Sequence, residues 1–168
     1  MDPVDRFIQR ARAQRMGQSG QWQALYEELR SFTQRGDLSA LERIFRALDD
    51  PQHQTLASMA WRGRVYAGPE GARAFLADVA SPPACERGWP DRHEARLQDY
   101  GALLAHAWDA AMLATLLPSA RTSASRVVHA AAIEERVLRE GAVTDPALVA
   151  PPLDRSTFPT YHRTRRTF

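Results

Sequence analysis

The segment from Asp91 to Leu117 is the longest apolar stretch of the sequence, and it limits the fold more than any other feature. Its ends carry the signals of a helix, because Asp91 can act as N-cap with Glu94 three residues later, and Pro118 disfavours the α conformation at Leu117. About 26 helical residues at roughly 1.5 Å each give a length of about 39 Å, which spans a domain of this size. The sequence therefore predicts one long helix over about residues 92–117, with neighbouring helices covering most of its circumference.

Two faces of this predicted helix carry different residues. One apolar stripe is formed by Leu97, Gly101, Leu104, Trp108 and Ala111. On the opposite face His106 lies three residues from Asp109 and seven from Asp99. A histidine beside carboxylates can act as a general acid or base, but a histidine satisfied by aspartate inside a helical bundle has the same spacing. We favour the structural interpretation, because no nucleophile or oxyanion site accompanies the histidine.

Apolar residues recur at helical spacing in six further segments, at about residues 3–16, 21–35, 38–48, 52–67, 72–80 and 123–139. Capping residues precede two of them, namely Asp2 with Pro3 and, further along, Asp37. The predicted fold is all-α, an irregular bundle of about six to seven helices around the long central helix, with an extended C-terminal tail. We expect residues 1–150 to form a single helical domain that could be subdivided at the loop 81–90. Residues 151–168 are expected to be an extended or disordered tail, rich in basic and aromatic residues.

Basic charge is supplied by arginine alone: the chain has 22 basic residues, and neither lysine nor asparagine occurs. The missing lysine excludes a P-loop lysine, a Schiff-base lysine and a Ser-Lys dyad. A Gly-x-Gly-x-x-Gly phosphate-binding motif is also absent. Both missing residues use A-rich codons while Ala, Arg and Pro are abundant, so we infer a GC-rich bacterial or large-viral genome.

Metal and cofactor motifs are incomplete in this sequence. His93 and Glu94 begin the zinc-protease motif His-Glu-x-x-His, but Leu97 stands where the second histidine is required. The single cysteine, Cys85, excludes an internal disulfide and lies in no recognisable motif. We therefore expect no metal, no cofactor and no catalytic residue.

Two segments of the chain concentrate arginine. Four arginines on the first predicted helix are candidate contacts for nucleic-acid phosphates, although neighbouring aspartates dilute their charge: Arg6, Arg10, Arg12 and Arg15. Residues 151–168 hold four arginines against Asp154, a net charge of +3, whereas the whole chain carries +2, so residues 1–150 carry −1. The candidate partner-binding residues of this tail combine aromatic rings with guanidinium groups: Phe158, Tyr161, Arg163, Arg165, Arg166 and Phe168.

These features favour a non-enzymatic helical module for protein–protein interaction, such as a subunit, adaptor, chaperone or immunity-type protein, whose partner is another protein or a second copy of the chain. The alternative is an accessory nucleic-acid-binding subunit that uses the arginine-rich N-terminal helix and the tail. An enzyme that uses His106 with Asp99 or Asp109 is the least favoured hypothesis. No uninterrupted apolar run reaches about 18 residues and no secretory signal is recognisable, so we expect a cytoplasmic protein without membrane contact.

Overall fold

The computed structural model describes residues 1–14, 19–87 and 93–140, and these residues form helices and no strand. The prediction of an all-α fold is confirmed. The chain divides into two compact units, Met1–Trp89 (unit 1) and Pro90–Phe168 (unit 2), and the division falls within the predicted loop 81–90. Each helix of the described residues is too short or too polar to cross a membrane.

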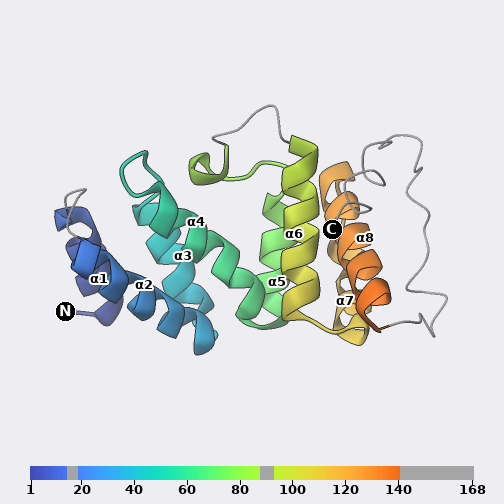
Figure 1. Ribbon diagram of the computed structural model, residues 1–168, viewed down its shortest axis with the longest axis horizontal. Helices are drawn as coiled ribbons and strands as arrows, with labels where there is room; N and C mark the ends of the chain where they lie inside the picture. The colour runs from blue at the N-terminus through green and yellow to red at the C-terminus, as the bar shows by residue number, and fades with distance from the viewer. Residues whose placement is uncertain (15–18, 88–92, 141–168) are drawn as a thin grey trace. The chain divides into compact units, whose positions relative to one another are not determined.

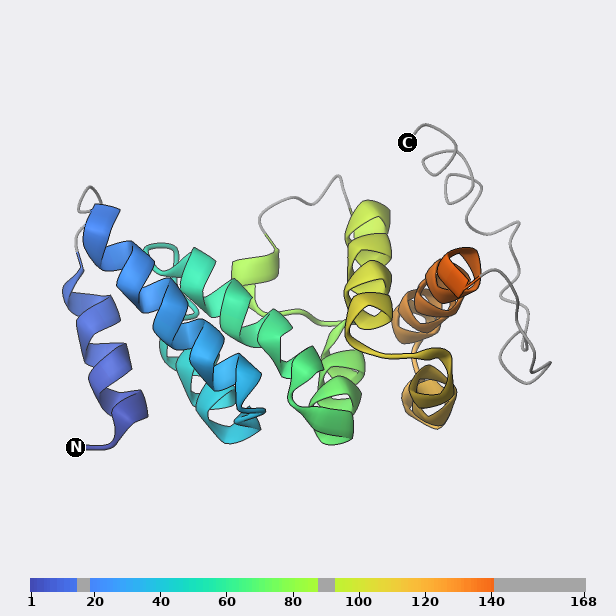
Figure 2. The ribbon, with the colours of Figure 1, turned by 60° about the horizontal axis from the view of Figure 1, so that its bottom comes forward.

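Unit 1 contains helices α1 to α5 and two short 3-10 turns (Figure 1). Their bounds are α1 Pro3–Ala13, α2 Ser19–Gln34, α3 Leu38–Ala47, α4 Gln54–Gly63, η1 Arg64–Tyr66, α5 Gly68–Asp78 and η2 Ala84–Glu86. Helices α2, α3 and α4 lie side by side, and α1 packs across α2 and α3 (Figure 2). This arrangement places α1 at one end of unit 1, so that part of its surface has no further helix of the unit against it.

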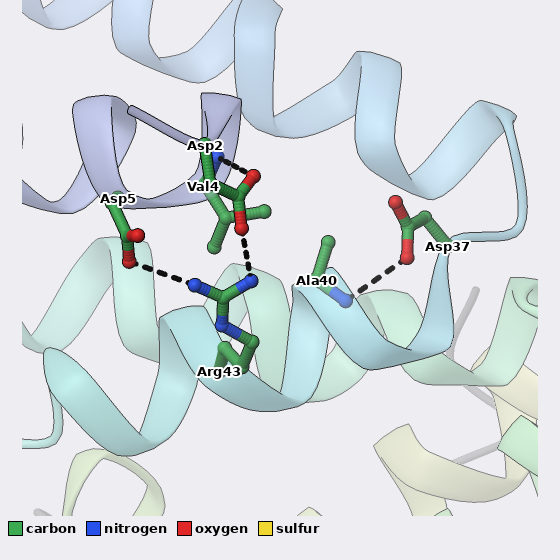
Figure 3. Close-up of polar contacts among 6 residues, drawn as sticks. All are labelled: Asp2, Val4, Asp5, Asp37, Ala40 and Arg43. Carbon is green, nitrogen blue, oxygen red and sulfur yellow. Dashed lines mark hydrogen bonds and ion pairs between the residues drawn. The ribbon is translucent and has the colours of Figure 1, made fainter.

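The predicted capping residues start two of these helices. A carboxylate oxygen of Asp2 accepts a hydrogen bond from the backbone N–H of Val4 at 3.1 Å, and Pro3 occupies the first helical position of α1. Asp37 accepts the N–H of Ala40 at 3.0 Å at the start of α3 (Figure 3). Such caps satisfy N–H groups that have no partner within the helix, and each stabilises it by about 1 kcal/mol.

Unit 1 has an apolar core drawn from all five of its helices. Phe7 of α1 meets Phe32 of α2 edge to face with ring centroids 6.0 Å apart, and Trp61 of α4 contacts Phe75 of α5 at 4.6 Å. The core is completed by fully buried aliphatic side chains, among them Leu29, Leu41, Ile44, Leu48, Leu56 and Leu76. Burial of each such side chain contributes roughly 1.5–3 kcal/mol, so packing rather than propensity holds these short helices in place.

Unit 2 is a smaller helical group with bounds α6 His93–Ala107, α7 Ala110–Leu116, η4 Leu117–Ser119 and α8 Ser123–Glu140. Helix α8 begins with a reciprocal cap, because the Oγ1 of Thr122 accepts the N–H of Ser125 while the Oγ of Ser125 accepts the N–H of Thr122. Helices α6 and α8 run side by side and make the main contact of the unit (Figure 1). Their backbones approach closely at Gly101, where an added Cβ would lie 2.3 Å from the Cβ of Ala131.

The structure corrects one part of the prediction: the helix expected over about residues 92–117 is interrupted at Trp108 and Asp109. Asp109 has an extended backbone, with ψ 172°, and its side chain accepts the N–H of Met112 at 2.8 Å as N-cap of α7. The Nε of Arg136 on α8 donates to the carbonyl oxygen of Trp108 at 2.6 Å. A cap on one side of the break and a guanidinium donor on the other therefore replace the hydrogen bonds of a continuous helix.

Candidate functional site

Helix α1 is the candidate site, because its two flanks carry different charges. Its inner face is buried through Val4, Phe7 and Ala11, and this fixes the rotation of the helix on α2 and α3. The charged residues that alternate with these apolar positions are consequently divided between a flank toward α3 and a flank toward α2. On the α3 flank the charged side chains of α1 bind residues of α3, whereas the α2 flank borders an open groove.

On the α3 flank, Arg43 binds two carboxylates at the start of α1, those of the N-cap Asp2 and of Asp5. Its guanidinium donates to Asp2 and, at 2.7 Å, to Asp5 (Figure 3). The hydrogen bond from Arg43, helped by the N–H of Val4, lowers the pKa of the Asp2 carboxyl below its ordinary value. Arg12 donates to the carbonyl oxygen of Ala47 at 2.9 Å, where the last turn of α3 offers unpaired carbonyl groups and the negative end of its dipole.

On the α2 flank lies an open groove of about 670 Å³, which we call the α1 groove. Its lining residues follow one line along the helix and are joined by one residue of α2: Met1, Pro3, Arg6, Gln9, Arg10, Ala13 and Glu28. A guanidinium nitrogen of Arg10 forms an ion pair with the carboxylate of Glu28, and both side chains are partly exposed. Met1 is 76% exposed at one end of the groove, which makes it the most exposed large apolar side chain of the described residues.

The charge of the α1 groove follows from the ion pairs of the opposite flank. Asp2 and Asp5 are bound to Arg43 on the opposite flank, so Glu28 is the one carboxylate among the residues that line the groove with Arg6 and Arg10. The groove lining thus has two guanidinium groups against one carboxylate. The sequence predicted that aspartates dilute the charge of this helix, but the fold separates them from the arginines of the groove.

The four arginines predicted as nucleic-acid contacts do not share one surface. Arg6 and Arg10 line the α1 groove, whereas Arg12 ties the helix to α3 on the other flank. Arg15 lies outside the described residues. The six predicted partner-binding residues of the tail, Phe158, Tyr161, Arg163, Arg165, Arg166 and Phe168, also lie outside the described residues.

A buried polar cluster fastens the loop after α5 to α4. Glu86 is only 5% exposed and receives two hydrogen bonds from Arg62, at 3.0 and 2.9 Å, and one from Ser58. The carboxylate of Asp49 caps η2 by accepting the N–H groups of Ala84 and Cys85 at 3.2 and 2.8 Å. The predicted loop 81–90 carries no periodic pattern, so sequence reasoning missed this cluster.

The single cysteine belongs to this fastened loop. Cys85 is buried, and burial, with the nearby carboxylates of Asp49 and Glu86, raises the pKa of its thiol to about 12. Since the thiolate is the nucleophilic form, these surroundings keep the sulfur unreactive at neutral pH.

A second buried charge, Arg64, lies in the core of unit 1 at only 2% exposure. Its guanidinium donates to the carboxylate of Asp78 at 2.7 Å and lies 5.0 Å from the ring centroid of Phe45. A carboxylate oxygen of Glu42 is 3.8 Å away. Paired carboxylates and aromatic rings stabilise a buried cation, so these contacts explain why the guanidinium of Arg64 can be buried.

The predicted His106 cluster occupies the surface of unit 2. His106 and Asp99 are both exposed on α6, and the carboxylate of Asp109 caps α7. The other histidine of this unit with a described side chain, His129, is buried, and its Nε2–H donates to the carbonyl oxygen of Leu113 at 2.7 Å. In the described ranges, no three His, Cys, Asp or Glu residues are grouped so that they could hold a metal ion.

The chain matches no protein-family model, no curated protein and no solved structure.

Proposed function

We propose that the protein is a non-enzymatic helical module for protein–protein interaction, and that the α1 groove is its docking surface. The observation that carries the proposal is the separation of charge on α1. Arg43 binds the carboxylates of Asp2 and Asp5 on one flank, and Arg6 and Arg10 lie on the other. Arginine is enriched at protein interfaces, because its planar fork binds carboxylates and its aliphatic stem packs on apolar groups.

The shape of the lining supports the same proposal. Pro3, Arg6, Arg10 and Ala13 follow each other at helical spacing, so the groove extends along the whole of α1. Met1, Pro3 and Ala13 add apolar surface at its ends, and methionine adapts to different partner shapes. A partner helix laid beside α1 would bury these apolar groups and the arginine stems together.

Hydrogen exchange of the native complex tests the proposal. The full chain is purified under native conditions, its assembly mass is measured, and exchange is compared with that of the isolated chain. We expect a retained protein or a second copy, with slower exchange in α1 and the adjoining part of α2. A chain that stays strictly monomeric, or a complex that leaves α1 and α2 unprotected, would contradict the proposal.

Charge reversal supplies the matched comparison. Arg6→Glu combined with Arg10→Glu is expected to release the partner. Arg46→Glu combined with Arg73→Glu changes the net charge equally at two other exposed arginines of unit 1 and is expected to retain it. If both variants lose the partner equally, attraction by overall charge explains retention and the α1 groove is not the docking surface.

A further inference from the structure

The spacing of charge in the α1 groove indicates what kind of partner it accepts. Arg6 and Arg10 are four residues apart on one helix, so their stems start about 6 Å apart on the same face. A partner helix that carries two carboxylates at positions i and i+4 presents them at the same separation. Two helices laid side by side could therefore pair both arginines with both carboxylates.

Glu28 shows that a carboxylate already fits this position. It reaches from α2 to the guanidinium of Arg10 and forms the ion pair inside the groove. Both side chains are partly exposed, 55% for Arg10 and 30% for Glu28, so this pair is in contact with water and contributes little to folding. A carboxylate supplied by a partner can take the place of Glu28 on Arg10.

Glu28 also sets the expected response of the groove to mutation. Its charge occupies Arg10 and repels an incoming carboxylate, so it opposes the binding that the arginines favour. Removal of Glu28 and removal of either arginine should then change affinity in opposite directions. A groove that bound its partner through apolar contacts alone would not show these opposite changes in affinity.

We propose that the α1 groove binds an acidic amphipathic helix of a protein partner, with two carboxylates one turn apart that pair with Arg6 and Arg10 and displace Glu28. This inference rests on the proposed function and names the chemistry of its partner. A protein helix is favoured over nucleic acid because the lining includes the apolar groups of Met1, Pro3 and Ala13. A phosphate backbone could pair with the arginines, but it would leave these apolar groups without a partner.

A synthetic peptide tests the proposal without knowledge of the natural partner. The probe is a fluorescent helical peptide of about 14 residues, roughly four turns, with leucine on one face and glutamate at i, i+4 spacing beside it. Its matched control replaces each glutamate by glutamine. Anisotropy titrations use the full chain, and circular dichroism confirms that each variant remains folded.

Four substitutions separate the outcomes. Arg6→Gln and Arg10→Gln are each expected to weaken binding of the glutamate peptide by about 2–5-fold, as for exposed ion pairs, and Glu28→Gln to tighten it by a similar factor. Arg73→Gln on α5 should leave the affinity unchanged. Weaker or unchanged binding by Glu28→Gln, an equal loss with Arg73→Gln, or no binding of the glutamate peptide would overturn the proposal.

The control ligands distinguish failure of this inference from failure of the proposed function. Equal binding of the glutamine and glutamate peptides, with the α1 groove still protected in the native complex, overturns the acidic partner and keeps the docking surface. Tighter binding of a single-stranded oligonucleotide of about 20 nucleotides, lost in Arg6→Gln and Arg10→Gln, overturns both in favour of nucleic acid.

Discussion

At the scale of single residues, Gly101 determines how closely α6 and α8 approach. An added Cβ would meet the Cβ of Ala131 at 2.3 Å and the carbonyl oxygen of Val128 at 3.0 Å, so one of the helices would have to move. We expect Gly101→Ala to lower the free energy of unfolding by about 1–3 kcal/mol, although alanine is the better helix former. Urea unfolding followed by circular dichroism measures this loss.

Gly20 provides the opposite control. It lies in α2 with nothing within 4 Å of its added Cβ, so Gly20→Ala should raise the free energy of unfolding by about 0.5–1 kcal/mol. Adding Ala131→Gly to Gly101→Ala should restore part of the lost stability, because it removes the nearest atom that the added Cβ would meet. Equal stabilisation by Gly20→Ala and Gly101→Ala would show that the helices are not in close contact at this point.

His129 is predicted to make the stability of unit 2 depend on pH. Burial lowers the pKa of its imidazole below the ordinary value of 6.5, and the hydrogen bond to the carbonyl of Leu113 offsets only part of this effect. The unfolded chain therefore takes up the proton more readily than the folded chain. Its contribution to stability is fully present above pH 6.5 and is lost as the pH falls from there through the lower folded-state pKa.

The difference in the free energy of unfolding between wild type and His129→Gln isolates this contribution, because glutamine keeps an N–H donor and does not titrate. Urea unfolding is measured between about pH 7.5 and pH 5. As the pH falls, the free energy of unfolding of wild type should drop by up to about 1.4 kcal/mol per pH unit more than that of the variant. Parallel pH profiles would mean that His129 is accessible to water in the folded state.

At the scale of elements, the break between α6 and α7 depends on the cap at Asp109. Asp109→Ala removes the acceptor for the N–H of Met112 and should lower the free energy of unfolding by about 1 kcal/mol. Asp109→Ser retains a capping oxygen and should restore most of the loss, which urea unfolding can measure. An Asp109→Ala variant as stable as wild type would indicate that the two helices merge without cost when the cap is absent.

The break also shows where sequence reasoning reached its limit. Apolar spacing and caps such as Asp2 and Asp37 predict helices because they are local signals, and the structure confirms both caps. The interruption depends in addition on Arg136, which lies 28 residues beyond Trp108 and donates a hydrogen bond to the carbonyl oxygen of Trp108. Apolar residues on both sides of the break kept helical spacing, so no local signal distinguished a capping aspartate from an aspartate on the surface of a long helix.

The candidate site was predicted only in part, for the same reason. The sequence proposed Arg6 and Arg10, with Arg12 and Arg15, as candidate contacts for nucleic acid, because arginines on a short helix can be counted. It could not assign Arg12 to the other flank or pair Asp2 and Asp5 with Arg43, since these contacts join residues 35–41 positions apart. Charge separation on α1 is a product of packing and becomes visible only when the buried face of the helix is known.

At the scale of the whole molecule, the distribution of charge separates the two functions considered for this chain. Residues 1–150 carry a net charge of −1 and residues 151–168 carry +3, so most of the chain offers no net attraction to a phosphate backbone. A binder of single-stranded nucleic acid that used the four arginines of the tail would show a slope of log affinity against log salt near −3. An interaction module would bind an oligonucleotide weakly, with a slope shallower than about −1.

Anisotropy with the full chain between about 50 and 200 mM salt measures this slope. We expect weak binding at the lowest salt, little changed by Arg6→Gln with Arg10→Gln, because residues 1–150 carry a net charge of −1 and the tail holds the excess of basic charge. The same double substitution should weaken binding of the acidic peptide, so the two ligands respond differently to one change. A steep slope that Arg6→Gln with Arg10→Gln makes shallower by about 1.4 would instead assign the arginines of α1 to nucleic acid, since each lost contact with a single-strand phosphate removes about 0.7 from the slope.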